Sequence, residues 1–350
     1  MKIAILGDTH FGARNRNITI ENWQRKFYEE FFWPKIDELG ISHVIQVGDY
    51  FDSRKWLNIQ TIAFQKEVFV KPSQERNVTV DVLVGNHDIP FRHSLENNSP
   101  GQILEHEENI TVYDKPFQAV FHGHEITLMP WICKANYDEC MDVVRKGGQT
   151  IIGHFEIKGF LMHPGSYSRD GMTRGDFSNW NQVISGHYHS QSNEGNILYT
   201  GTPYQMMWSD AGGKHGFWIF DTDTGETTFY KNPFDYYHKI DYTDETKLES
   251  LEKYNLKESY VKLMVKEKTD FVNFEKFVDA INFKEPFELK IVESFEEYSS
   301  DNVKELIELS ETTDIISEYI DDVATTNNKE AIKKIMIEIY EEALHLDADI

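Results

Sequence analysis

The run Lys2-Ile-Ala-Ile-Leu6, which ends in Gly7-Asp-Thr-His10, decides the fold because its pattern recurs along the chain. A short apolar run rich in β-branched residues, stopped by glycine and a polar group, is typical of a buried strand. Four more runs of this kind follow: His43–Val47 before Gly48-Asp49, Val78–Val84 before Gly85-Asn-His-Asp88, Thr150–Gly153 before His154, and Gln182–Gly186 before His187-Tyr-His189. The sequence therefore predicts five buried strands that each end in a polar group.

Helical patterns separate the first three strands. Residues 21–39 and 58–70 are amphipathic and long enough to form helices. Strands that alternate with helices predict an α/β fold. In open sheets of this class, ligands bind in the crevice beyond the carboxyl ends of the strands, so the polar groups at those ends are candidate site residues.

The pattern changes in two later stretches and again near the C-terminus. Residues 117–129 and 216–231 are predicted to form hairpins that add antiparallel strands to the sheet. Beyond residue 234 the spacing of apolar residues indicates a β-α-β-α-β unit and then amphipathic helices. The predicted organisation is a main α/β domain over 1–234, a small α/β domain over 235–295, a linker over 296–302 and a helical region over 303–350.

The composition of the 350 residues fits a globular protein, with 40% hydrophobic and 27% charged residues. We find no apolar run near the roughly 18 residues that a membrane span needs, so we expect a soluble, cytoplasmic protein without a membrane partner. Two cysteines, Cys133 and Cys140, are present without a Cys-x-x-Cys pair. This supports neither a disulfide framework nor a thiolate zinc site.

The charge is distributed unevenly along the chain. The formal net charge is −24, which by itself argues against a nucleic-acid partner. However, all nine arginines lie before residue 235, whereas the last 116 residues hold 30 acidic and 14 basic residues. Arginine is therefore confined to the part of the chain that carries the candidate site, and acidic residues predominate most strongly in the rest.

Seven side chains at the five strand ends can bind metal ions. Two divalent ions about 3.5 to 4 Å apart need a bridging carboxylate and several terminal ligands, which this set provides. Glycine precedes five of the seven residues, and we expect it to let the backbone turn sharply. The seven residues are Asp8, His10, Asp49, Asn86, His154, His187 and His189.

The ordered motifs Asp-x-His, Gly-Asp, Gly-Asn-His-Asp, Gly-His and Gly-His-x-His resemble those of the calcineurin-like metallophosphoesterase family over most of residues 1–215. The resemblance implies a sandwich of mixed β-sheets flanked by helices. It also implies two ligand sets that share Asp49: Asp8, His10, Asp49 and His189 for one ion, and Asp49, Asn86, His154 and His187 for the other. Oxygen and imidazole ligands without thiolate suit Mn²⁺, with Mg²⁺, iron or zinc as alternatives.

The same resemblance implies catalytic roles for His87 and Asp88. His87 would face the scissile phosphate as a cationic stabiliser and general acid, and Asp88 would fix the tautomer of that ring. The expected reaction is metal-dependent hydrolysis of a phosphodiester. The position of Asp52 leaves two roles open, because its carboxylate could support the site or cap the following helix.

Cationic residues in the loops that follow the motifs favour a polyanionic substrate. Together with the small α/β domain and the terminal helices, this layout resembles the nuclease subunits of SbcCD-type DNA double-strand-break repair complexes, in the compact form found in phages. The resemblance implies a homodimeric endo- and exonuclease acting in DNA repair and recombination, located in the host cytoplasm if phage-encoded. The candidate DNA-binding residues are Arg14, Arg16, Arg54, Lys55, Arg92, Arg169 and Arg174.

The terminal helices would, by the same resemblance, bind an SbcC-type coiled-coil ATPase, while residues 235–295 would form a capping domain. Periodicity alone also fits two helices that pack on their own domain. The candidate partner-binding residues are Ile332, Ile335, Met336 and Ile339.

Two other functions stay open on the sequence alone. Residues 48–52 are similar to a motif of protein serine/threonine phosphatases, so a metal-dependent protein or nucleotide phosphatase is one alternative. A catalytically silent scaffold that tethers DNA is the other. Many members of the nuclease family have histidine where Asp52 stands, which leaves the balance of endo- and exonuclease action undecided.

Overall fold

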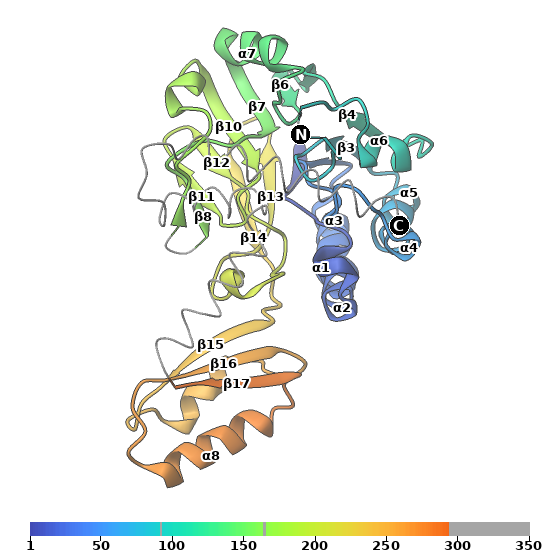
Figure 1. Ribbon diagram of the computed structural model, residues 1–350. Coiled ribbons are helices and arrows are strands. Elements are labelled where there is room, and N and C mark those ends of the chain that lie inside the picture. Colours follow the sequence, from blue (N-terminus) through green and yellow to red (C-terminus); the bar gives the residue numbers. More distant parts are fainter. Residues whose placement is uncertain (92, 164–165, 294–350) are drawn as a thin grey trace, which may run out of the picture. The chain divides into compact units, whose positions relative to one another are not determined.

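The computed structural model describes residues 1–91, 93–163 and 166–293 (Figure 1). Two compact units can be distinguished in it. The first contains 1–238, 254–260 and 284–287, and the second contains, among the described residues, 239–253, 261–283 and 288–293. The linker and helices predicted over 296–350 lie outside the described residues.

One six-stranded sheet holds the first three predicted strands in the order β14-β13-β1-β2-β3-β4. Strands β1 to β4 run parallel, whereas β13 pairs antiparallel with both β1 and β14. The strands are β1 (Lys2–Leu6), β2 (His43–Gln46), β3 (Thr79–Leu83), β4 (Ile110–Tyr113), β13 (Gly216–Asp221) and β14 (Thr227–Lys231).

Helices fill the connections between these strands. The predicted helix over 21–39 consists of α2 and α3 joined by the π-helical segment Tyr28–Phe32, and Lys66–Val70 joins α4 to α5 in the same way. The helices are α1 (Ala13–Arg16), α2 (Ile18–Phe27), α3 (Trp33–Leu39), α4 (Ile59–Gln65), α5 (Lys71–Glu75) and α6 (Ser99–Leu104).

A second six-stranded sheet has the order β11-β12-β10-β7-β6-β5. Its strands are β5 (Phe117–Phe121), β6 (His124–Met129), β7 (Gly148–His154), β10 (Trp180–Gly186), β11 (Ser192–Glu194) and β12 (Ile197–Tyr199). Helix α7 (Tyr137–Lys146) connects β6 to β7, and the hairpin of β8 (Leu161–His163) and β9 (Ser166–Tyr167) precedes β10.

The hairpin predicted over 117–129 forms, but only one of its strands adds in the predicted direction. Strands β5 and β6 pair antiparallel, whereas β6 pairs parallel with β7. The reason is that α7 returns the chain to the start of the sheet before β7 begins. The carboxyl end of β6 therefore lies at the same edge as that of β7.

The two sheets pack face to face, and their central strands are buried on both sides, whereas the edge strands β5, β11 and β14 are not. In β1, Ile3 and Ile5 belong to the cluster between the sheets, whereas Ala4 and Leu6 pack against the helices on the other face. A second outer layer, which includes Cys140 of α7, covers the other sheet. The predicted α/β sandwich of mixed sheets flanked by helices is confirmed.

The second unit is built mainly from the three-stranded sheet β15-β16-β17 and α8. On α8, Phe274 and Phe277 pack their rings against Tyr242, and Asp270 caps the helix by accepting a hydrogen bond from the Asn273 backbone. The elements are β15 (Tyr237–Tyr242), a 3₁₀ helix (Leu248–Lys253), β16 (Tyr260–Val265), α8 (Phe271–Asn282) and β17 (Glu288–Val292). Among the described helices, none combines the length and the hydropathy needed to cross a membrane.

Candidate metal centre

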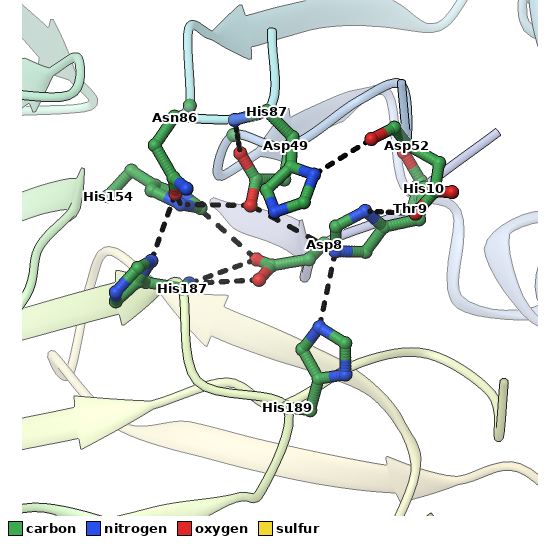
Figure 2. A network of polar contacts seen from close by, with 12 residues as sticks. Asp8, Thr9, His10, Asp49, Asp52, Asn86, His87, His154, His187 and His189 are labelled. Atoms are coloured by element: carbon green, nitrogen blue, oxygen red, sulfur yellow. Dashed lines mark hydrogen bonds and ion pairs between the residues drawn. The ribbon is translucent and has the colours of Figure 1, made fainter. Parts of the chain in front are cut away.

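The side chains predicted at the five strand ends meet in one cluster (Figure 2). They come from the carboxyl ends of β1, β2, β3, β7 and β10, so both sheets contribute. Within the described residues, the cluster contains two groups of three side chains whose ligand atoms lie within 4.8 Å of one another: Asp8, His10 and His189 in one, and Asp49, His154 and His187 in the other.

The first group brings two imidazole rings close together, tilted by 58° to each other. Nε2 of His10 lies 3.2 Å from Nε2 of His189. Neighbouring ring nitrogens at this distance need a shared proton or a cation between them. The Asp8 carboxylate beside them is fully buried and accepts hydrogen bonds of 3.0 and 3.2 Å from the His187 backbone, which fixes β1 against β10.

The second group is organised around His154. Its Nδ1 lies 2.8 Å from the carbonyl oxygen of Val47, which can only accept, so Nδ1 carries a proton and Nε2 faces the cluster. This Nε2 is 2.9 Å from the side-chain oxygen of Asn86 and 3.3 Å from the Asp49 carboxylate. The same Asn86 oxygen lies 3.0 Å from Nδ1 of His187. Asn86 is therefore part of this group.

Asp49 lies between the two groups. One carboxylate oxygen, Oδ2, is 3.9 Å from Nε2 of His10 and 3.3 Å from Nε2 of His154. The other, Oδ1, accepts a hydrogen bond of 2.7 Å from the His87 backbone. This is the position that a carboxylate shared by two ions would occupy.

Three of the cluster residues have strained backbones. His10, Asp49 and His187 have φ values of 42°, 51° and 91°, a region that residues with a side chain seldom adopt. Such strain is retained where the surrounding structure enforces it, and it is concentrated at functional sites.

The glycines before the cluster residues act in two ways. Gly48 has a φ of 101°, in agreement with the predicted sharp turn. At Gly85 and Gly186 the reason is space instead. A Cβ at Gly85 would lie 2.2 Å from Oδ1 of Asp49, and one at Gly186 would lie 2.4 Å from Oδ1 of Asp8. At these two positions glycine lets neighbouring backbone approach the buried carboxylates.

The electrostatics of the cluster favour a bound cation. Burial raises the pKa of the Asp8 carboxyl to about 7, although the charge of His154 opposes this. Burial would lower the pKa of His10 and His154, but the carboxylates around them outweigh it and raise both to about 9. Divalent cations compete with protons for these same atoms. The buried oxygen and imidazole donors therefore fit divalent metal ions.

His87 lies beside the cluster as predicted, but Asp88 does not contact its ring. The Asp88 carboxylate accepts hydrogen bonds from the backbone N–H groups of Tyr50, Phe51 and Gly85, at 3.2, 3.0 and 2.8 Å. The ring Nδ1 of His87 instead lies 2.8 Å from the carbonyl oxygen of Asp52. The prediction that Asp88 orients His87 is corrected, because three amides already occupy its buried carboxylate.

The open question of Asp52 is answered by its contacts. Its side chain lies 3.2 Å from Nδ1 of His10, whereas Asn58 caps the following helix α4. Partial burial would raise the pKa of Asp52, but the hydrogen bond to His10 outweighs it and lowers this pKa. Asp52 therefore supports two rings, His10 through its carboxylate and His87 through its carbonyl. His10, Asp52 and His87 also form a third group of neighbouring ligand atoms.

Sequence reasoning missed Trp131. Its ring packs against His187 and His154, with centroids 5.2 and 5.8 Å apart, and its backbone N–H donates to the Val84 carbonyl at 2.7 Å. Trp131 follows β6, which was predicted to add to the sheet in the antiparallel direction. An antiparallel β6 would end at the edge of the sheet opposite to the cluster. The missing signal was the parallel pairing of β6 with β7.

The predicted DNA-binding cations are not equally available. The guanidinium of Arg16 lies 3.0 Å from Glu21, and that of Arg174 lies 2.5 Å from Glu194. Arg14 in α1 is exposed, as are Lys55 and Arg169 in loops, and Arg54 is half-buried. Outside the described residues lie Arg92 and the predicted partner-binding residues Ile332, Ile335, Met336 and Ile339.

The comparison with known families agrees with this geometry. The model of the calcineurin-like phosphoesterases matches residues 1–257, which include every residue of the cluster. The chain belongs to the calcineurin-like phosphoesterase family. Members of this family use divalent metal ions, and the two groups of neighbouring ligand atoms lie where this phosphoesterase would need them.

Three curated proteins resemble this phosphoesterase to different extents. Exonuclease subunit 1 of Enterobacteria phage T4 is 30% identical over 349 residues, covering 98% of this chain and 99% of that protein. The DNA double-strand break repair protein Mre11 of Methanocaldococcus jannaschii is 22% identical, covering 95% and 89%. Metallophosphoesterase 1 of Ailuropoda melanoleuca is 32% identical over 97 residues, 27% of this chain and 25% of that protein. The first two similarities extend over both units.

Proposed function

We propose that this phosphoesterase hydrolyses DNA phosphodiesters with two manganese ions, as the nuclease subunit of an SbcCD-type complex in double-strand-break repair and recombination. The observation that carries the proposal is the position of Asp49, whose one carboxylate oxygen contacts both groups of donors. The names of two full-length relatives, an exonuclease subunit and a double-strand break repair protein, support DNA as the substrate.

Two ligand sets follow from the contacts. Asp8, His10 and His189 would hold one ion, and Asn86, His154 and His187 the other, with Asp49 shared between them. Bound there, the ions would neutralise charge on the phosphate oxygens and lower the pKa of a water nucleophile. Imidazole and oxygen donors without sulfur suit manganese, and magnesium, iron and zinc are the alternatives.

His87 would supply the proton for the leaving oxygen. Its Nδ1–H donates to the Asp52 carbonyl, so a proton available for transfer would be at Nε2. Its backbone N–H donates to the bridging Asp49, which keeps the ring next to the centre. Asp88 contributes indirectly, because its carboxylate holds the backbone of Tyr50, Phe51 and Gly85. We therefore propose His87 as the catalytic acid and Asp88 as a positioning residue.

The assembly is proposed on resemblance rather than on contacts. We infer that residues 235–295 form a capping domain, that the chain forms a homodimer, and that residues 303–350 bind an SbcC-type ATPase. A cytoplasmic location would follow from a function on intracellular DNA. The net charge of −16 over the last 116 residues supports a protein partner rather than independent DNA binding by that region.

The test is cleavage of plasmid and single-stranded DNA by the purified full-length chain. We expect cleavage with added manganese, loss of cleavage with a chelator, and loss in Asp49→Asn. The matched control is Asp81→Asn, an equally buried aspartate that is paired with His43 outside the cluster. Cleavage that resists the chelator, or an Asp49→Asn variant as active as the control, would refute the proposal.

A further inference from the structure

The large aromatic side chain of Trp56 is exposed to solvent. The chain has seven tryptophans, and the other six are buried or half-buried, whereas Trp56 is 82% exposed. Tryptophan side chains are highly buried on average in proteins. An almost fully exposed tryptophan ring therefore indicates a surface that binds a ligand or a partner molecule.

The loop that carries Trp56 is tied to the catalytic centre. It begins at Asp52, whose carboxylate lies 3.2 Å from the His10 ring and whose carbonyl lies 2.8 Å from the His87 ring. It ends at Asn58, which caps α4 by accepting a hydrogen bond of 2.9 Å from Gln60. Four residues of chain span at most about 14 Å. The Trp56 backbone is therefore within about 14 Å of the residue that supports both rings.

The loop is also held internally. The Trp56 backbone N–H lies 3.4 Å from the Ser53 hydroxyl, and Leu57 packs against the main hydrophobic core. Trp56 thus lies on a short segment that is anchored at both ends. A ring on such a segment loses little conformational freedom when it binds a ligand.

The chemistry of the loop fits a nucleic-acid strand. Arg54 and Lys55 directly precede the ring, and Lys55 is exposed. Cations that follow a phosphate backbone, combined with an aromatic face on which bases stack, are the means by which proteins bind single strands. In a duplex interior both faces of each base are already covered by neighbouring base pairs. An exposed ring therefore recognises an unpaired base.

We propose that Trp56 stacks on an unpaired nucleobase close to the scissile phosphate and so directs this enzyme to single-stranded DNA. The inference rests on the proposed nuclease function and adds a substrate-binding residue to it. The competing interpretation is a contact with another protein chain, because Ile59, three residues further on, is also 82% exposed. Ile59 has no face on which a base can stack. A variant of Ile59 therefore distinguishes the two interpretations.

The experiment uses full-length protein with manganese and two labelled single strands of equal length, one intact and one with abasic sites near the cleavage position. Stacking is worth about 1–3 kcal/mol per base, so Trp56→Ala should raise KM for the intact strand by about 5- to 150-fold. The preference for the intact over the abasic strand should disappear. Trp56→Phe should restore most of it, and Ile59→Ala should retain it.

Binding of the same strands, measured by fluorescence anisotropy without added metal, makes the result independent of cleavage. Equal affinities of wild type and Trp56→Ala for the intact strand would overturn the inference. An equal loss in Ile59→Ala would also overturn it, because Ile59 cannot stack on a base and the loss would then have another cause. If the wild type hydrolyses bis(p-nitrophenyl) phosphate but neither cleaves nor binds DNA, the proposed function fails and the inference fails with it.

Discussion

The His87 ring is positioned by its neighbours' backbones. Its Nδ1 contacts the Asp52 carbonyl, and its own N–H donates to Asp49. We predict that His87→Ala keeps both metal ions and DNA affinity but lowers the rate by at least about 10²-fold, the usual contribution of a general acid. His93→Ala, in an exposed position on the same loop, is the control and should match wild type. Loss of metal in His87→Ala would make His87 a ligand, as its place in the third group of donors permits.

Asp88 is expected to affect stability more than proton transfer. In Asp88→Asn, an amide group replaces one of the two oxygens that accept from Tyr50, Phe51 and Gly85, so at least one buried N–H loses its partner. We predict a decrease of about 1–3 kcal/mol in the free energy of unfolding, measured by urea denaturation. Asp142→Asn, on the exposed side of α7, should leave this free energy within about 0.5 kcal/mol. An unchanged stability in Asp88→Asn would contradict the structural role.

The contact between β1 and β10 depends on a glycine at the end of β10. A methyl group at Gly186 would lie 2.4 Å from Oδ1 of Asp8 and 2.8 Å from the Val47 carbonyl. We predict that Gly186→Ala loses about 1–3 kcal/mol of stability and binds manganese more weakly, because Asp8 must move. At Gly175 the nearest atom is 3.5 Å away, so Gly175→Ala is the control. The manganese affinities of the two folded variants are measured by titration. Equal affinities would contradict the prediction.

The sequence was sufficient to predict where strands end, because each β-branched apolar run stops at a glycine and a polar residue. It predicted the five strands and the seven polar residues that the structure brings together. It could not predict the direction of β6 or the contact of Trp131 with His187, since hydrophobic periodicity contains no information on which strand lies beside which. It also could not predict that backbone amides occupy Asp88, because such partners are invisible in residue identities.

For the molecule as a whole, the distribution of charged residues along the chain matches two proposed functions, DNA cleavage and partner binding. The part before residue 235 holds every arginine and the candidate metal centre, whereas the acidic remainder is proposed to bind the ATPase. We predict that replacing Ile335 and Ile339 with aspartate in the full chain abolishes binding to an SbcC-type ATPase, because two charges would have to be desolvated in an apolar groove. DNA cleavage by the isolated chain should persist. Gel filtration of the mixed proteins measures this, with Lys334→Asp as the control, and an intact complex would place the partner surface elsewhere.

The most direct test of the account is a crystal structure with manganese, recorded with anomalous scattering at the manganese absorption edge. The account predicts two peaks. One should be bound by Asp8, His10 and His189 and the other by Asn86, His154 and His187, with Asp49 contacting both. A single peak bound by His10, Asp52 and His87, or the absence of any peak at Asp49, would contradict it.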